Sequence, residues 1–271
     1  MVSIAGLAVM DANSIQPDYL RALIMGKPGS GKTTAASTIA LAGKTLFVDL
    51  PSEQGTRSFQ GAPWAKNIDV VRPTSITQLD DIYDALSAGG HGYKAVVLDS
   101  LSAVQTMAIR AAQGRSESRM SEFTDQPDSV RIQQYGAVKS FLEDLTIFWN
   151  SLASANRKEP LHVVMIAQPK AAEDEVLDMT VIRPDVQPGA IPKILSTPDY
   201  IMYTAVEENE DTEKMEHVLH FGSNPGKSMK ARLPQDKYGV IPYRLVGKNA
   251  NLTLIGRKLG IGGFPTLKKE N

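Results

Sequence analysis

The chain has 271 residues, 42% of them hydrophobic and 22% charged, which is ordinary for a globular protein and enough for one large α/β domain or two small ones. Its formal net charge of −1 excludes a general attraction to nucleic acid or membranes, so any polyanion must bind a local basic patch. The absence of cysteine excludes disulfides, thiolate metal sites and cysteine nucleophiles, and no apolar run is long enough to cross a membrane.

Residues 1–20 mix apolar and turn-forming residues and are predicted to form an N-terminal arm or strand. Residues 4–10 fit either a terminal strand of the chain's own sheet or an arm that extends a neighbouring subunit's sheet. The short apolar start lacks the basic region of a signal peptide, so no cleaved leader is expected.

Residues 21–34 carry the most specific motif of the chain. An apolar run over residues 22–25 predicts a buried strand, GKPGSGKT matches G-x-x-x-x-G-K-[ST], and the alanine-rich segment that follows predicts a helix. Glycines let backbone N–H groups point at phosphate oxygens, and the helix N-terminus adds partial positive charge. Lys32 is expected to reach the β- and γ-phosphates, and the Thr33 hydroxyl to bind Mg²⁺. The predicted nucleotide-binding residues of this loop are Gly26, Pro28, Gly29, Ser30, Gly31, Lys32, Thr33 and Thr34.

Residues 45–50 predict a second buried strand, which ends in a turn that contains Glu53. A carboxylate just past the carboxyl end of a strand beside a phosphate loop lies where an attacking water would lie, which makes Glu53 the candidate general base. A solvated turn glutamate or a helix cap is the alternative. A strand over residues 68–71 and a helix over residues 76–86 are predicted next.

Asp99 follows four apolar residues, which is the second half of a nucleoside-triphosphate site. A strand beside the first one would place this carboxylate near Mg²⁺, so Thr33 and Asp99 are the predicted metal ligands. Ser100 follows Asp99 where some ATPases have a catalytic glutamate, and this favours Glu53 as the base.

Two long polar segments flank the second half of the predicted core. Residues 113–131 fit a surface loop or a contact loop for a single nucleic-acid strand, and residues 132–152 predict a long helix with an apolar core stripe. Residues 161–167 predict a fourth buried strand that ends at Gln168, whose amide would sense the γ-phosphate or merely cap the strand. Residues 171–194 are predicted to be irregular, and nucleotide state would order or release them. Strands are predicted over residues 199–204 and 215–221.

Lys227, Lys230 and Arg232 gather within six residues of a turn that has no acidic residue. This is either a solvated basic turn or a set of cations that reach DNA phosphates or the γ-phosphate of a neighbouring subunit. Residues 246–271 predict a partly flexible basic tail.

The ordered segments GKPGSGKTT, LFVDLPSEQG, AVVLDSLSAV, VVMIAQPK and NPGKSMKAR resemble the RecA-like ATPase core, and most closely the compact bacteriophage recombinases of that superfamily. The resemblance implies a RecA-like P-loop α/β fold, with a mostly parallel central sheet flanked by helices and a C-terminal antiparallel extension. It divides the chain into an N-terminal arm (1–20), an ATPase core (21–245) and a basic tail (246–271).

The resemblance also implies a function: an ATP- and Mg²⁺-dependent single-stranded DNA-binding recombinase, acting by annealing or strand exchange in a bacterial cytoplasm. It implies a head-to-tail filament or ring with DNA-stimulated hydrolysis at subunit interfaces, and a single-strand DNA-binding protein as a further partner. Glu53 would activate water, Gln168 would couple the γ-phosphate to the loop that follows it, and Lys227, Lys230 and Arg232 would act in trans. The implied DNA-binding residues are Arg115, Arg119, Arg131, Lys170 and Arg183. The alternatives are another RecA-core motor, of helicase or packaging type, or a nucleotide-switched binding protein.

Overall fold

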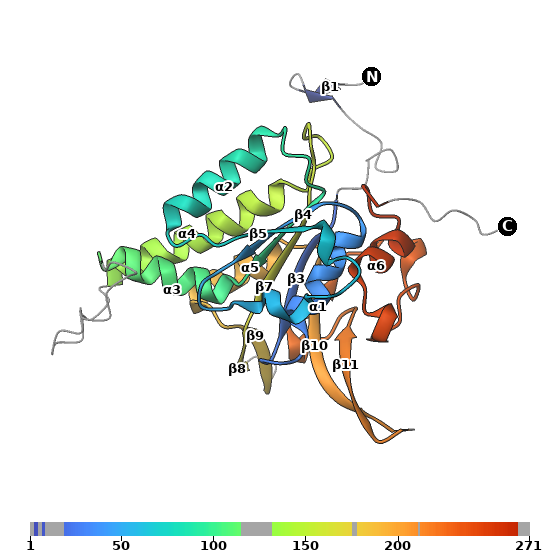
Figure 1. The fold of residues 1–271 in the computed structure, drawn as a ribbon. Helices are drawn as coiled ribbons and strands as arrows, with labels where there is room; N and C mark the ends of the chain where they lie inside the picture. Colours follow the sequence, from blue (N-terminus) through green and yellow to red (C-terminus); the bar gives the residue numbers. More distant parts are fainter. Residues whose placement is uncertain are drawn as a thin grey trace.

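A nine-stranded sheet forms the centre of the molecule (Figure 1) in a computed structural model that describes residues 3–4, 7–8, 19–114, 132–174, 178–210 and 212–264. Its strand order is β13-β11-β10-β3-β7-β6-β4-β5, with the short β12 paired to β10. The strands are β3 (Arg21–Gly26), β4 (Thr45–Asp49), β5 (Ile68–Val71), β6 (Ala95–Asp99), β7 (His162–Ala167), β10 (Tyr200–Asn209), β11 (Lys214–His220), β12 (Lys230–Ala231) and β13 (Arg244–Val246).

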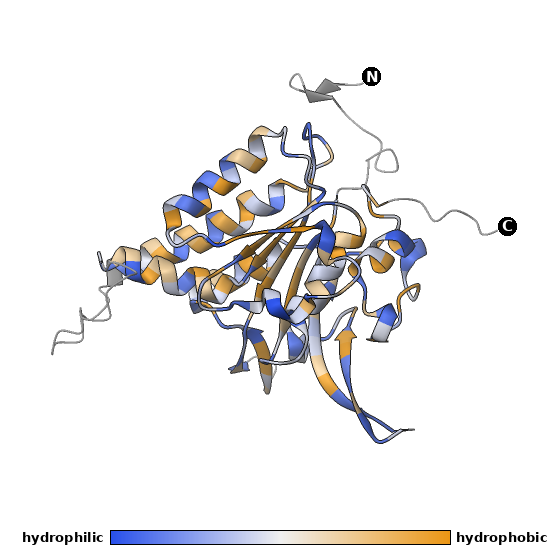
Figure 2. Cartoon of the chain, viewed as in Figure 1, coloured by the Kyte–Doolittle hydropathy of each residue, from blue (hydrophilic) through white to orange (hydrophobic). Residues whose placement is uncertain are grey.

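Six strands run parallel; in their order across the sheet they are β5, β4, β6, β7, β3 and β10. In contrast, β11, β12 and β13 pair antiparallel to their neighbours. The predicted fold class, a mostly parallel sheet with a C-terminal antiparallel extension, is therefore confirmed. The central parallel strands are apolar runs because both of their faces are covered, and they appear as a continuous orange band in Figure 2.

Helices cover both faces of the sheet. They are α1 (Lys32–Ser37), α2 (Ile76–Ala88), α3 (Leu101–Ala112), α4 (Ile132–Ser151), α5 (Ile191–Ser196) and α6 (Leu252–Leu259). Leu23 and Met25 of β3 pack with α2, α3, α4 and α5, whereas Ala22 and Ile24 pack with α1 and α6 on the other face. None of the described helices is long and apolar enough to span a bilayer.

The structure differs from the predicted elements in three places. Residues 171–194, predicted to be irregular, contain most of a hairpin of β8 (Pro169–Asp174) and β9 (Met179–Pro184), and α5 begins at Ile191. The apolar stripe of α4 is only partly core, because Tyr135 and Phe148 are 45% and 51% exposed. The N-terminal segment contributes β1 (Ser3–Ile4) and β2 (Leu7–Ala8), which pair with each other as a separate sheet.

Much of the segment set apart as a tail packs on the core. Leu252, Ile255 and Leu259 of α6 are buried against the α1 side of the sheet, and the Leu252 N–H donates to Thr38 Oγ1 at 2.9 Å. The spacing of these apolar residues places them on one face of the helix, which explains the packing. Residues 246–264 therefore belong to the same body as the core and not to a loose appendage.

Candidate functional site

The loops of the predicted site meet because the strands before them end in register. Asp49 of β4 pairs with Asp99 of β6, Asp99 pairs with Ile166, and Met25 pairs with Ala167. The carboxyl ends of β3, β4, β6 and β7 therefore lie along one edge of the sheet. This edge is where parallel α/β sheets place ligands.

The phosphate loop joins β3 to α1 through a tight turn. Gly29 and Gly31 have φ values of 77° and 93°, which L side chains rarely adopt, and the Ser30 N–H donates to Lys27 O at 3.1 Å. The Ser30 hydroxyl lies 2.7 Å from Thr204 Oγ1, and a Cβ on Gly26 would lie only 2.2 Å from that same oxygen. Gly29 and Gly31 are thus required by the turn, and Gly26 is required by its close packing against β10.

Lys32 points back into the loop, where its Nζ donates to Lys27 O at 3.1 Å. Burial lowers the pKa of this amine, and the nearby carboxylates of Asp99 and Glu53 oppose that shift. An ammonium group held in this way is placed to exchange a backbone carbonyl for phosphate oxygens.

Thr33 and Asp99 lie together as the predicted Mg²⁺ ligands, with the Thr33 hydroxyl donating to Asp99 Oδ2 at 2.7 Å. A Cβ on Gly55 would lie 2.8 Å from Thr33 Oγ1 and 3.1 Å from Asp99 Oδ2, so a glycine keeps space beside both oxygens. A hydroxyl and a carboxylate beside a phosphate loop are oxygen ligands of the kind that Mg²⁺ prefers. The residues present therefore fit this ion.

Asp99 is only 1% exposed, and burial is the main reason that its pKa is raised to about 7. The nearby carboxylates of Glu53 and Asp49 add to this shift, whereas the Thr33 hydrogen bond and Lys32 oppose it. Between pH 4 and pH 7 the folded protein consequently holds a proton here that the unfolded chain releases. The contribution of Asp99 to folding stability falls as pH rises through that window.

Asp99→Asn is therefore expected to stabilise the protein in the absence of nucleotide and metal. A rise from 3.8 to about 7 corresponds to at most about 4 kcal/mol at pH 8, and the gain should vanish near pH 4. Urea unfolding with a chelator at pH 5 and pH 8 measures it. Buried His162 also has a shifted pKa, which is lowered to about 3. Its contribution is the same in the wild type and in Asp99→Asn, so it cancels when the two unfolding free energies are subtracted. A stability difference that does not change between the two pH values would contradict this prediction.

Glu53, the predicted base, lies between two side chains from neighbouring strand ends. The Ser100 hydroxyl donates to Glu53 Oε1 at 2.7 Å, and Gln168 Nε2 donates to Glu53 Oε2 at 3.2 Å. The Gln168 backbone N–H in turn donates to Ser102 Oγ at 3.1 Å. The predicted base and the predicted sensor are thus in direct contact, next to the Thr33 and Asp99 pair.

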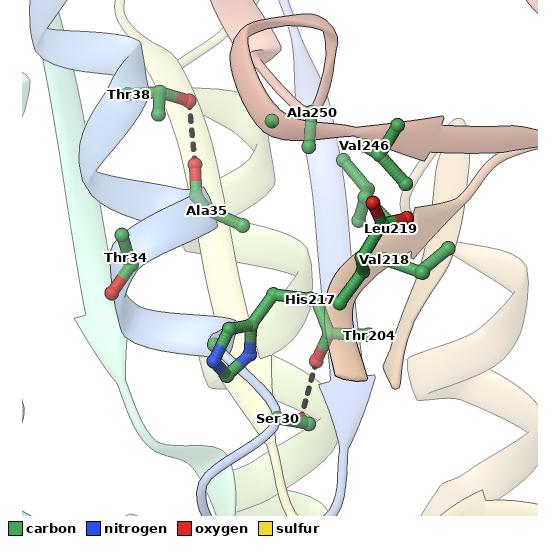
Figure 3. Close-up of a pocket in the computed structure, with 13 residues that line it drawn as sticks. Ser30, Thr34, Ala35, Thr38, Thr204, His217, Val218, Leu219, Val246 and Ala250 are labelled. Carbon is green, nitrogen blue, oxygen red and sulfur yellow. Dashed lines mark hydrogen bonds between the residues drawn. The ribbon is translucent and has the colours of Figure 1, made fainter. Parts of the chain in front are cut away.

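A cavity of about 490 Å³ opens beside the phosphate loop (Figure 3). Thr34 and Thr38 line it from the α1 side, and Leu219, Val246 and Ala250 line it from the opposite side. The imidazole of His217 lies over the loop, with Nδ1 3.3 Å from where a Cβ on Gly31 would be. The size and the mostly apolar lining suit the nucleoside part of a nucleotide whose phosphates lie on the loop.

The predicted trans-acting cations do not join this site. β12, which carries Lys230, pairs with the start of β10, at the edge of the sheet opposite the phosphate loop. Lys230 Nζ donates to Ser196 O at 2.9 Å, and Arg232 pairs with Asp199 at 3.1 Å. Burial, together with the neighbouring cations, lowers the pKa of Lys230 to about 8.

Lys227, predicted to bind the nucleotide, contacts two aromatic side chains of its own subunit. Its Nζ lies 2.9 Å from His220 Nδ1 and 5.1 Å from the centre of the Tyr203 ring. This geometry is that of a cation packed on an aromatic face.

The predicted DNA-binding residues are in part described. Arg115, Arg119 and Arg131 lie outside the described residues. Lys170 lies 3.7 Å from Asp185, and Arg183 pairs with Asp174, so the two cations of the β8–β9 hairpin each contact a carboxylate.

Several residues of the site were not assigned a role from the sequence. Ser100 binds Glu53, Thr204 binds Ser30, and Arg72 binds the buried carboxylate of Asp49 at 3.1 Å. Each of these contacts joins segments that are far apart in the chain. The one available signal was the position of Ser100, directly after Asp99 at the end of a strand.

The chain is similar to a known family and, at low identity, to solved structures. A family model described as an AAA domain matches residues 18–233, whereas no curated protein matches the chain. A KaiC-like protein of the archaeon Pyrococcus horikoshii is similar at 12% identity, over 81% of this chain and 84% of that chain, with a TM-score of 0.39. The flagellar accessory protein FlaH of Methanocaldococcus jannaschii is similar at 9% identity, over 85% of each chain, with a TM-score of 0.42. With four fifths of its length matched, the chain belongs to the AAA domain family.

Proposed function

We propose that this protein is an ATPase that hydrolyses ATP to ADP and phosphate, and that it acts on single-stranded DNA as an assembled recombinase. The proposal that the protein hydrolyses ATP rests on the position of Glu53. Its two carboxylate oxygens bond Ser100 and Gln168 at the edge of the sheet where Lys32, Thr33 and Asp99 meet.

The proposed chemistry assigns each of these residues a step. Backbone N–H groups of the phosphate loop and the ammonium of Lys32 hold the phosphates, and the adjoining cavity takes the nucleoside. Thr33 and Asp99 would hold Mg²⁺, which supplies positive charge to the phosphates. Glu53 accepts a proton from the attacking water, whose oxygen forms a bond to the γ-phosphorus. The bond to the bridging oxygen breaks, and ADP leaves.

Gln168 offers a route from the nucleotide to the rest of the molecule. Its side chain contacts Glu53, β8 begins at the next residue, and its carbonyl accepts from the Asp185 N–H at 2.7 Å just after β9. The base of the β8–β9 hairpin is therefore tied to the residue that contacts the proposed base. A change at the γ-phosphate would shift this hairpin relative to the sheet.

A second function is favoured by the charge of the hairpin. Lys170 and Arg183 are both paired, and Glu173 and Asp178 add further negative charge to the same element. An element of this kind repels phosphates more than it attracts them. The second candidate is therefore a RecA-core ATPase that drives or switches a partner other than DNA.

The ATPase rate with and without single-stranded DNA separates the two candidates. For a recombinase we expect DNA to stimulate turnover, and binding to weaken with the logarithm of salt at a slope of about −0.7 per phosphate contacted. Steady-state hydrolysis and DNA binding measured by fluorescence anisotropy across a salt series provide the test. Turnover that DNA leaves unchanged would favour the second candidate.

The position of Lys230 and Arg232 leads to a prediction about assembly. These cations face away from their own phosphate loop, so any effect on phosphoryl transfer would fall on a neighbour's nucleotide, across a head-to-tail interface. Subunits carrying Lys32→Ala and subunits carrying Lys230→Ala with Arg232→Ala should each be inactive alone and partly active when mixed. Lys158→Ala removes an exposed cation before β7 and should not affect turnover. A mixture that stays inactive would contradict action in trans.

A further inference from the structure

Asp49 is a carboxylate with no exposed surface at the end of β4. It accepts hydrogen bonds from the Gly55 N–H at 3.2 Å, from the Thr56 hydroxyl at 3.1 Å and from Arg72 Nε at 3.1 Å. A buried carboxylate is strongly destabilising unless charge and hydrogen bonds compensate it. Asp49 therefore holds the end of the turn that follows β4, with Arg72 as the cation beside it.

This turn carries two groups of the proposed active site. The Leu50 N–H donates to Asp99 O at 2.9 Å, and the Glu53 N–H donates to Leu50 O at 2.9 Å. Gly55 then passes so close to Thr33 and Asp99 that a Cβ would collide with the Thr33 hydroxyl. The position of the turn thus determines both where the Glu53 carboxylate lies and how much space is left beside the predicted Mg²⁺ ligands Thr33 and Asp99.

Arg72 directly follows β5, the outermost strand of the sheet, and its side chain reaches the turn that follows β4. Its Nε bonds Asp49 and its Nη2 lies 3.1 Å from Thr56 Oγ1, so a single planar guanidinium holds both residues. We propose that Arg72 is a positioning residue for hydrolysis, which acts through Asp49 and Thr56 to keep Glu53 in place. This inference rests on the proposed ATPase function.

The contact affects the geometry of the turn as well as overall stability. The Arg72 side chain is 56% exposed, which weakens the ion pair, and Asp49 keeps its hydrogen bonds from Gly55 and Thr56 when the guanidinium is removed. Without the guanidinium, Asp49 keeps its buried charge but loses the cation, and the turn must open to hydrate it. A displacement of about 1 Å at a catalytic group lowers rates by roughly 10²-fold.

The test compares Arg72→Gln and Arg72→Lys with Lys66→Gln, which removes an exposed cation from the same connection between β4 and β5. We expect Arg72→Gln to lower kcat about 10- to 100-fold while the Kd of a fluorescent ADP analogue changes less than about twofold. Arg72→Lys should restore part of kcat. Hydrogen exchange of residues 50–59 in the nucleotide-free protein should be faster in Arg72→Gln and unchanged in Lys66→Gln. In an Asp49→Asn background, Arg72→Gln should cause little further loss, because both act through one contact.

Three results would overturn the inference. The first is a kcat within about twofold of the wild type in Arg72→Gln. The second is a loss of ADP affinity that matches the loss of kcat, which would assign Arg72 to binding or folding. The third is a Lys66→Gln variant that is equally impaired. A wild-type protein that does not hydrolyse ATP would overturn the proposed function and this inference together, whereas an active wild type with an active Arg72→Gln removes the inference alone.

Discussion

Replacing Lys32 with alanine is expected to remove ATP turnover and to weaken nucleotide binding strongly. The buried Lys32 ammonium donates to a carbonyl of the loop, and on nucleotide binding it exchanges this bond for hydrogen bonds to phosphate oxygens. Charge-assisted hydrogen bonds of this kind contribute about 1.5–3 kcal/mol. Binding should therefore weaken roughly 10- to 150-fold, since about 1.4 kcal/mol is a factor of ten. Turnover should fall a further 10²- to 10³-fold or so, because Lys32 also stabilises charge that develops in the transition state.

Titration of a fluorescent ATP analogue and a steady-state phosphate assay measure the two effects separately. Lys27→Ala is the matched control, because Lys27 is an exposed lysine of the same loop and the substitution keeps the carbonyl that contacts Lys32. This control should retain most of its activity. Wild-type ATPase activity in Lys32→Ala would remove the central claim that the phosphate loop is the active site.

The second large effect is expected for Glu53→Gln, which should stop hydrolysis but leave ATP bound. The amide keeps the size of the carboxylate and can still accept from the Ser100 hydroxyl, but it cannot take a proton from water. A general base contributes about 10²- to 10⁴-fold, so kcat should fall within that range.

Single-turnover hydrolysis and the affinity for ATP at equilibrium distinguish loss of chemistry from loss of binding. Glu208→Gln neutralises an exposed glutamate of β10 and provides the control for charge. If Glu53→Gln turns over at the wild-type rate, the base is another group. If its ATP affinity collapses, Glu53 serves binding.

Local sequence patterns were sufficient for the central sheet and for the phosphate loop. Buried parallel strands such as β6 and β7 are unbroken apolar runs, so each can be predicted from its own residues without knowledge of the neighbouring strands. The loop is specified by its own residues, because glycine at positions 29 and 31 is needed for backbone angles that the turn itself requires. The register of these strands then brought Thr33, Glu53, Asp99 and Gln168 together as predicted.

The remaining features depend on tertiary contacts that no local pattern encodes. β8 and β9 have few buried residues, and Lys170 and Glu173 of β8 are exposed, so neither strand has an alternating apolar face. Their pairing through backbone hydrogen bonds therefore gives no hydrophobic pattern in the sequence. Arg72 acquires its role only because β5 lies beside β4. The apolar face of α6 was readable at Leu252, Ile255 and Leu259, but the surrounding cations and glycines favoured a tail.

The pairing of β3 has a consequence for biosynthesis. The strand that leads into the phosphate loop is made first, but its two partners, β7 and β10, follow more than a hundred residues later, and the Thr38 contacts with α6 come last. At a translation rate of about 5–20 residues per second, residues 26 and 204 leave the ribosome roughly 10–35 s apart. Until β7 is made, β3 has neither of its partners in the sheet. Glu53, Asp99 and Gln168 can meet beside the phosphate loop only after the chain has grown past residue 168, so the site forms well after the loop itself is synthesised.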